Sequence, residues 1–225
     1  AEDLKKSEVL FYPHAVILTE ERVKPLEEYV SAGGRLVMGC RTGYKDENGR
    51  CVMDTLPGLA SGLCGTDIPE YSFVAPDEGK VLVRWEDACV EAAVFNDILS
   101  PMGENAEVLA SYASSYYEGE PALIRNRFGK GEAYYFGGAF ALDTAQLFLE
   151  KLGVAEPYAS WIEAPACCEI AVRRKEGEAY LFVLNYAHES VRIRLAQPLE
   201  ELTNQKVESG EQEVEKYGVR VYRMP

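Results

Sequence analysis

Cys40 is the residue of this chain that comes closest to a catalytic nucleophile. It follows the apolar run 35–39 directly after a glycine, where a strand would end and a loop begin. A cysteine attacks as a thiolate, which needs a neighbouring base and a polarised turn. The segment 39–43, GCRTG, lacks the G-x-C-x-G spacing of a nucleophile turn, and His188 lies far downstream. We therefore predict that Cys40 is a small buried thiol.

Adjacent carboxylates occur along the chain, and two carboxylates could do the chemistry of a glycosidase. The pairs include Glu20-Glu21, Glu27-Glu28, Glu86-Asp87 and Glu200-Glu201. A retaining glycosidase needs two carboxyl groups about 5–5.5 Å apart, whereas neighbours on a strand point to opposite faces. We predict that these pairs are solvated surface charges, and we assign no catalytic residue.

Metal and cofactor chemistry has little support in the sequence. The chain has two histidines, His14 and His188, and neither stands at ligand spacing from a cysteine. His14 follows an apolar run and a proline, which indicates a loop or strand-end position. We expect no metal site and no cofactor.

Two polar segments are candidates for a contact between subunits. The first comprises Arg41, Tyr44, Lys45, Asp46, Glu47 and Asn48, and the second comprises Arg125, Asn126, Arg127 and Lys130. Loops after parallel strands carry functional groups in open α/β sheets, and arginine is enriched at interfaces. For the second segment, charge pairing across a hairpin is an equally good interpretation.

The start of the chain indicates a strand, a helix and a second strand. Residues 9–12 and 35–39 are apolar runs. Between them, apolar side chains recur at helical spacing, at Val23, Leu26, Tyr29 and Val30. The side chain of Thr19 could cap this helix, and the glycines at 33–34 favour its end. Short connections of this kind predict a parallel pair of strands with a right-handed crossover.

Further elements are predicted before residue 156. Strands are expected at 79–85, 91–95, 107–112, 122–128 and 132–136, and helices at 56–63 and 141–152. The last two strands are joined by Gly-Lys-Gly, which predicts a hairpin. For the second helix we predict a buried face formed by Leu142, Ala145, Leu149 and Leu152.

A second domain is indicated after a linker at residues 157–165. The apolar period changes to two, with runs at 168–172, 179–184, 191–195, 213–216 and 219–223, which predicts a small antiparallel all-β domain. Residues 160–225 contain 9 basic and 11 acidic side chains, so they carry −2 of the total net charge of −14. We therefore place the domains at 1–156 and 160–225.

Composition argues against several partners. A net charge of −14 repels nucleic acids and anionic membranes, so we expect neither as a partner. No apolar run approaches the ~20 residues of a membrane span, and no secretory signal is visible. The six cysteines are scattered without a CxxC pair, which is typical of reduced thiols and predicts a cytoplasmic protein.

Several motifs occur together in a specific order and spacing. They are GGRLVMGCRTG at 33–43, KDENG at 45–49, LPG at 56–58, GLCG at 62–65 and YYEGEPALIRNRFGKGEAYYFG at 116–137. Together they resemble the middle, trimerisation domain of family 42 glycoside hydrolases, which are bacterial β-galactosidases. The segment CEIAVRRKEGEAYLFVLNY at 168–186 resembles the family's final β-domain. The resemblance covers nearly the whole chain.

The resemblance implies a flavodoxin-like or class I amidotransferase-like parallel sheet, followed by an antiparallel β-domain. In that family this region lies outside the catalytic barrel and holds a homotrimer together. The barrel carries the two glutamates that cleave terminal β-galactosides, and no residue here matches either motif. We therefore expect a non-catalytic assembly region of a β-galactosidase, inactive by itself.

The resemblance also implies that the first domain is truncated. The family's middle domain normally begins with another strand and helix before a segment like 9–18. We expect a second copy or a rearranged N-terminus to cover the sheet edge that this would expose.

Two other functions stay open. A cysteine amidotransferase-like enzyme would use Cys40, because amidotransferases of this broad fold place a cysteine at a comparable strand end. A carbohydrate-binding module would use the β-domain, whose aromatic side chains with potential exposure are Tyr186, Tyr217 and Tyr222.

Overall fold

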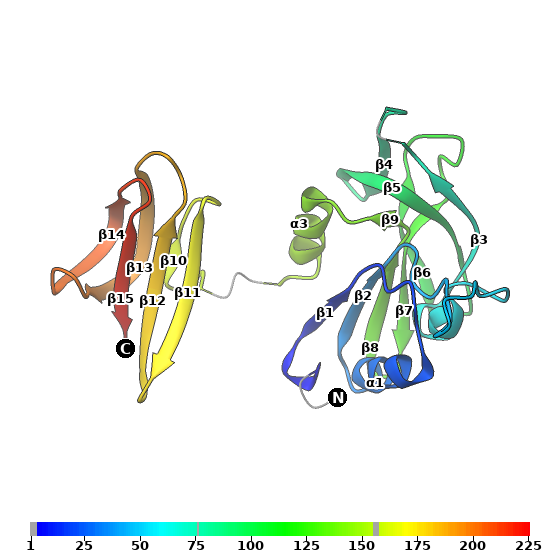
Figure 1. The fold of residues 1–225 in the computed structure, drawn as a ribbon, viewed down its shortest axis with the longest axis horizontal. Coiled ribbons are helices and arrows are strands. Elements are labelled where there is room, and N and C mark those ends of the chain that lie inside the picture. Colours follow the sequence, from blue (N-terminus) through cyan, green and yellow to red (C-terminus); the bar gives the residue numbers. More distant parts are fainter. Residues whose placement is uncertain (1–3, 76, 155–157) are drawn as a thin grey trace. The chain divides into compact units, whose positions relative to one another are not determined.

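The computed structural model describes residues 4–75, 77–154 and 158–225, which fold into two compact units (Figure 1). Unit 1 is the chain up to residue 154, and unit 2 begins at residue 155. Each unit has its own sheet and its own buried apolar clusters.

Unit 1 is organised around a nine-stranded sheet. Its elements are η1 (Leu4–Lys6), β1 (Val9–Tyr12), α1 (Glu20–Ser31), β2 (Arg35–Gly39), η2 (Gly58–Ala60), α2 (Ser61–Cys64), β3 (Thr66–Phe73), β4 (Val81–Trp85), β5 (Ala88–Pro101), β6 (Ala106–Tyr112), β7 (Pro121–Phe128), β8 (Gly131–Phe136), β9 (Gly138–Ala139) and α3 (Leu142–Lys151). The strand order is β1-β2-β8-β7-β6-β4-β5-β3, and β9 pairs with β5.

The sheet of unit 1 is mixed. Among the described strands, β1, β2 and β8 run parallel to one another, and the other pairings are antiparallel. The predicted parallel sheet is therefore limited to these three strands. The connections explain the difference, because α1 provides a crossover between β1 and β2, whereas the two-residue turn between β7 and β8 permits only an antiparallel hairpin.

Helix α1 buries the face that the sequence predicts. Its buried residues are Val23, Leu26, Tyr29 and Val30. The predicted side-chain cap was wrong, since the Thr19 side chain makes no capping hydrogen bond. Instead its carbonyl oxygen accepts the N–H groups of Arg22 and Val23, both at 3.0 Å. Glu20 and Glu21 add negative charge at the positive end of the helix dipole.

Helix α3 is rotated relative to the prediction. Of the predicted face, Leu142 is 73% and Leu149 39% exposed, whereas Leu152 is buried as predicted. The other buried residues are Thr144, Leu147 and Phe148. The Phe148 ring packs edge-on against Trp85, with ring centroids 5.0 Å apart. Burial of this large aromatic side chain, which the predicted face left out, sets the rotation of the helix.

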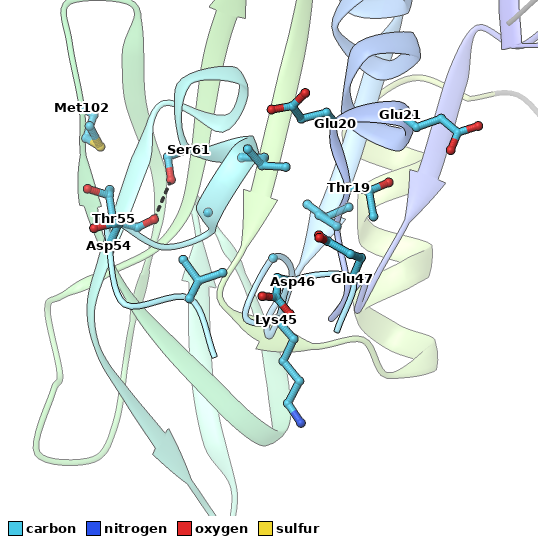
Figure 2. A pocket seen from close by; sticks show the side chains of 15 residues that line it. Thr19, Glu20, Glu21, Lys45, Asp46, Glu47, Asp54, Thr55, Ser61 and Met102 are labelled. Atoms are coloured by element: carbon cyan, nitrogen blue, oxygen red, sulfur yellow. Dashed lines mark hydrogen bonds between the residues drawn. The ribbon is translucent and has the colours of Figure 1, made fainter. Parts of the chain in front are cut away.

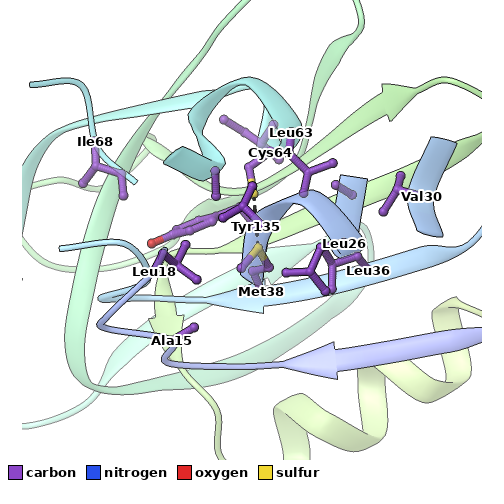
Figure 3. Packing of buried hydrophobic residues seen from close by; sticks show 14 of the residues in the cluster. Ala15, Leu18, Leu26, Val30, Leu36, Met38, Leu63, Cys64, Ile68 and Tyr135 are labelled. Atoms are coloured by element: carbon purple, nitrogen blue, oxygen red, sulfur yellow. Dashed lines mark hydrogen bonds between the residues drawn. The ribbon is translucent and has the colours of Figure 1, made fainter. Parts of the chain in front are cut away.

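The two faces of the unit 1 sheet bury different clusters. Successive residues of a strand point to opposite faces, so Leu36 and Met38 join the cluster that includes α1, and Val37 joins the cluster that includes α3. Figure 3 shows Leu26 and Val30 beside this part of the first cluster. The alternation fixes which side chains at the end of β2 face each layer.

Two strands of unit 1 differ from the prediction: β3 was not predicted, and β5 is longer than predicted. No strand is predicted at β3, and the predicted strand 91–95 is the middle of the 14-residue strand β5. The polar pair Asn96 and Asp97 interrupts the apolar pattern, although both side chains are fully buried.

Unit 2 is a six-stranded antiparallel sheet. Its strands are β10 (Ile162–Glu163), β11 (Cys168–Lys175), β12 (Glu178–Asn185), β13 (Val191–Glu201), β14 (Lys206–Val214) and β15 (Val219–Met224). The order is β10-β13-β15-β12-β11, and β14 pairs with β13. Residue 157 of the predicted linker lies outside the described residues. The linker prediction was wrong for Ile162 and Glu163, which form β10; Ile162 is buried and pairs with Leu195 in the sheet.

Candidate functional site at the carboxyl ends of the parallel strands

The candidate site begins where β1 and β2 end. His14 follows β1 and Cys40 follows β2, and their parallel register brings the two residues together. The Nδ1 atom of His14 lies 3.0 Å from the carbonyl oxygen of Cys40 and 3.5 Å from its Sγ atom. The sequence analysis placed His14 at a strand end but did not connect it with Cys40, 26 residues away.

Cys40 is a buried thiol, as predicted. Its side chain is 1% exposed. Burial raises the pKa of the thiol far above its usual range, and the negative charge of Asp97 raises it further, whereas Arg41 lowers it. Because nucleophilic attack requires a thiolate, this environment argues against amidotransferase-like chemistry at Cys40.

Asp97 of β5 connects three segments beneath this edge. Its Oδ2 atom accepts the backbone N–H of Arg41 at 2.9 Å and the hydroxyl of Tyr135 at 2.8 Å, and Oδ1 accepts the hydroxyl of Tyr44 at 2.9 Å. The Asp97 carbonyl oxygen accepts the hydroxyl of Tyr112 at 2.9 Å. We call these five residues the Asp97 network. The sequence analysis missed Asp97; its position inside an apolar run, VFNDIL, is the signal that could have found it.

Burial shifts the pKa values of the titratable groups in the Asp97 network. Burial raises the pKa of the Asp97 carboxyl, opposed by hydrogen bonds from Arg41, Tyr135 and Tyr44. Burial, and then the charge of Asp97, also raise the pKa values of Tyr44, Tyr112 and Tyr135. The tyrosines therefore stay protonated and act as hydrogen-bond donors.

Arg41 begins the first candidate segment and is fixed by aromatic rings. Its guanidinium carbon lies 4.1 Å from the ring centroid of Tyr44, 4.8 Å from that of Tyr71 and 4.9 Å from that of Phe95. Its Nη1 atom is buried and has no hydrogen-bond partner among the described residues. Attraction to the ring faces compensates part of this cost. Arg41 and the buried Tyr44 thus anchor the loop from below.

The rest of this loop borders a groove of about 950 Å³. Figure 2 shows Lys45, Asp46 and Glu47 and the start of α1 on one side, with Asp54, Thr55, Ser61 and Met102 on the other. The lining residues are Leu18, Thr19, Glu20, Glu21, Gly43, Lys45, Asp46, Glu47, Val52, Asp54, Thr55, Gly58, Leu59, Ser61 and Met102. The sequence analysis found the loop 45–48 but not the other walls, which come from separate segments.

The carboxylate of Asp46 shapes the loop rather than the groove. Its Oδ1 atom accepts the backbone N–H groups of Asn48 and Arg50, both at 2.9 Å. Glu47 and Asn48 are exposed, and the Glu47 carboxylate accepts the Asn48 amide at 3.3 Å. The loop therefore has a defined turn with exposed polar side chains.

The second candidate segment divides into paired and unpaired side chains. Arg125 of β7 forms ion pairs with Glu107 and, at 3.4 Å, with Glu132. Asn126 is buried, and its Nδ2 atom donates to the carbonyl oxygens of Gly62 and Leu63 at 3.2 and 2.9 Å. Both side chains thus serve contacts within unit 1.

Arg127 and Lys130 differ from these two. Both are exposed. Neither has a carboxylate within 4.0 Å in the part of the chain that the structure describes. Within the described ranges they are the unpaired cations of the β7–β8 hairpin.

The described ranges offer no support for a metal centre. No group of three or more His, Cys, Asp or Glu side chains within them could hold a metal ion. No helix there has the length and apolarity that crossing a bilayer requires.

Comparison with known proteins identifies the family. The model of the β-galactosidase trimerisation domain of glycoside hydrolase family 42 matches residues 1–156, more than two thirds of the chain. The chain belongs to this family. The model of the β-galactosidase C-terminal domain of family 42 matches residues 168–224.

Individual members of family 42 match along almost the whole chain. β-Galactosidase BgaA of Planococcus sp. (strain 'SOS Orange') is 31% identical over 229 residues, covering 98% of this chain and 33% of the relative. β-Galactosidase Pbg of Clostridium perfringens is also 31% identical, with the same coverage. The crystal structure of a β-galactosidase from Bacillus circulans sp. alkalophilus superposes with a TM-score of 0.87 at 26% identity, covering 99% of this chain and 34% of that chain.

The chain spans about a third of the length of the curated relatives it matches. The two family 42 domains account for residues 1–156 and 168–224. A catalytic barrel of about 250 residues has no place within these 225 residues. The comparisons give no support to the amidotransferase-like and carbohydrate-binding alternatives.

Proposed function

We propose that this chain is the non-catalytic assembly region of a retaining β-galactosidase that acts on terminal β-D-galactosides. The observation that carries the proposal is the match of the trimerisation domain to residues 1–156. The partner is a second and a third copy of the same chain, and neither nucleic acid nor a membrane takes part. The galactoside would bind to the barrel of the whole protein.

The contact between copies uses the accessible parts of the two candidate segments. Lys45, Asp46, Glu47 and Asn48 support this role because they are half-buried or exposed and lie in a defined turn. Arg127 and Lys130 support it because their charges are not used within the chain's described residues. The remaining residues of the two segments fix the loop and the hairpin through contacts within unit 1: Arg41, Tyr44, Arg125 and Asn126.

We also propose a domain and fold assignment. Residues 1–156 form the trimerisation-like domain and residues 160–225 the C-terminal β-domain. The strands β1, β2 and β8 with α1 correspond to a flavodoxin-like or amidotransferase-like core, to which the antiparallel strands are added. Parallel pairing around one crossover helix supports this correspondence. A cytoplasmic location is supported by free thiols at all six cysteines.

Light scattering after gel filtration tests the assembly function. One chain has a mass of 25.0 kDa, and a trimer has three times the mass of one chain. We expect the trimer mass at micromolar concentration and no turnover of a nitrophenyl β-galactoside. The mass of a single chain at every concentration would refute self-association, and turnover would refute the non-catalytic role.

A further inference from the structure

We propose that the groove of one copy binds the β7–β8 hairpin of the next copy through Arg127 and Lys130. Each copy would then use its groove toward one neighbour and its hairpin toward the other. This inference rests on the proposed assembly function and specifies which surfaces meet.

Part of the surface of the groove is apolar and exposed to water. Leu59 and Met102 line it and are half-exposed, and Met53, between two lining residues, is 90% exposed. Such a surface suits side chains with long hydrocarbon stems. Lysine and arginine have these stems and also carry a charge at the end.

The rim of the groove is acidic. Glu20, Glu21, Glu47 and Asp54 line it and are exposed. None of the four has a cation within 4.0 Å among the described residues. Figure 2 shows the amine of Lys45 pointing away from the other lining side chains, so it leaves these carboxylates unneutralised. The groove therefore favours a partner with apolar stems and positive ends.

The β7–β8 hairpin supplies that chemistry in a fixed position. Arg127 and Lys130 are its exposed and unpaired cations in the described structure. The backbone N–H of Lys130 donates to the Ser31 carbonyl oxygen at 3.0 Å. A Cβ atom on Gly129 would lie 2.6 Å from Ser31 Cα, which shows how closely the turn packs on the end of α1. The cations thus lie on a rigid turn, which lowers the entropy cost of binding.

The groove and the hairpin lie at opposite ends of α1. Thr19, just before the helix, lines the groove, and Ser31, its last residue, contacts the hairpin turn. Twelve helical residues span roughly 18 Å, so the hairpin of a copy cannot reach its own groove. Two different surfaces that pair between copies form a closed ring when the rotation closes, which agrees with a trimer.

Charge reversal tests the pairing in the full chain. The hairpin variant carries Arg127→Glu and Lys130→Glu, the groove variant carries Glu20→Lys and Glu47→Lys, and the swap variant carries all four substitutions. Asp46 is left intact because it holds the turn. The control variant, Arg84→Glu with Arg174→Glu, reverses two exposed arginines on other elements. Circular dichroism verifies that each variant is folded, and light scattering gives its mass.

We expect the trimer mass for the unchanged chain, the control and the swap variant, and the mass of a single chain for the hairpin and groove variants. The groove variant changes the net charge of the chain from −14 to −10. The smaller net charge would by itself favour non-specific association. Loss of the trimer in this variant would therefore come from the reversed groove charges.

Other outcomes separate the failure of the pairing from the failure of the assembly function. Trimers of both reversal variants would refute these surfaces but leave the proposed assembly intact. A swap variant that stays monomeric would refute direct pairing. An unchanged chain that forms dimers would refute the ring, and one that stays monomeric would refute the assembly function itself.

Discussion

At the residue scale, Asp97 is a buried carboxylate that joins three segments of unit 1. It is fully buried and accepts hydrogen bonds from Arg41, Tyr44 and Tyr135. Asp97→Asn keeps the volume but turns an NH₂ group toward one of these donors. We expect the free energy of unfolding of unit 1 to fall by about 2–4 kcal/mol. The measurement is urea unfolding at neutral pH with Trp85 fluorescence, in a Trp161→Phe background because Trp161 packs in unit 2.

The matched control for this substitution is Asp87→Asn. The Asp87 side chain is 93% exposed and lies 3.5 Å from the amine of Lys151. An exposed pair contributes little, so the change should stay within about 0.5 kcal/mol. Equal losses in the two variants would contradict the importance of the buried carboxylate.

Buried tyrosines make the stability of unit 1 sensitive to alkali. Burial raises the folded-state pKa values of Tyr44, Tyr112 and Tyr135 above the unfolded value of 10.0. Their contribution is therefore complete below about pH 10 and lost as the pH rises beyond it, by about 1.4 kcal/mol per pH unit for each tyrosine. Urea unfolding across the alkaline range measures this slope.

Tyr135→Phe supplies the control for the alkaline slope. It removes one buried titrating group, so the loss of unfolding free energy per pH unit should decrease by about 1.4 kcal/mol, the contribution of one tyrosine. The rise of phenolate absorbance with pH should also stay incomplete until unit 1 unfolds, because burial holds the pKa values of Tyr112 and Tyr135 well above the usual value. A complete rise before unfolding would show that the network is open to solvent.

At the element scale, Asn126 joins β7 to the short helix α2. Its amide donates to the carbonyl oxygens of Gly62 and Leu63, near the end of that helix. Asn126→Asp removes both donors and turns a negative charge toward two carbonyl oxygens. We expect unit 1 to lose about 2–4 kcal/mol of unfolding free energy, measured at a concentration where the chain is monomeric.

Asn105→Asp is the control for this element. Asn105 is exposed, so the same chemical change should alter stability by less than about 0.5 kcal/mol. If Asn126→Asp were equally mild in the monomer, the hydrogen bonds of Asn126 to Gly62 and Leu63 would contribute little to the stability of unit 1.

The sequence predicted elements whose pattern is local. The buried face of α1 and the β7–β8 hairpin follow from helical spacing and from a glycine turn. The rotation of α3 could not be predicted in this way, because it depends on the contact of Phe148 with Trp85 on another strand.

The candidate site was harder to predict from the sequence than the helices and strands were. The loop 45–48 was found because it follows a strand, but Asp54 and Met102 reach the groove from segments with no local pattern. The apolar run around Asp97 indicates that this residue is buried, but its role could not be predicted, because the donors to its carboxylate lie 38 to 56 residues away.

At the scale of the whole molecule, the two units have separate cores. Among the residues that the structure describes, the apolar cluster of unit 2 is formed by side chains of unit 2. Leu181→Ala truncates a fully buried side chain of that cluster and should destabilise unit 2 by about 2–5 kcal/mol. Hydrogen exchange in moderate urea, resolved by peptide, should show faster exchange in residues 158–225 and unchanged exchange in unit 1.

Leu63→Ala is the reciprocal variant, because Leu63 is buried in unit 1. It should accelerate exchange in unit 1 and leave unit 2 unchanged. Equal acceleration in both units by either variant would show that the chain unfolds as one cooperative body.

The Asp97 network also has a consequence for how long unit 1 stays folded. Its hydrogen bonds to Arg41, Tyr44 and Tyr135 close loops of 56, 53 and 38 residues, and such long loops close late in folding because of their entropy cost. Interactions absent from the transition state slow unfolding without affecting the folding rate. Asp97→Asn should therefore accelerate unfolding in stopped-flow experiments and leave refolding nearly unchanged. The buried carboxylate would then slow unfolding, and its main effect would be to lengthen the lifetime of the native state.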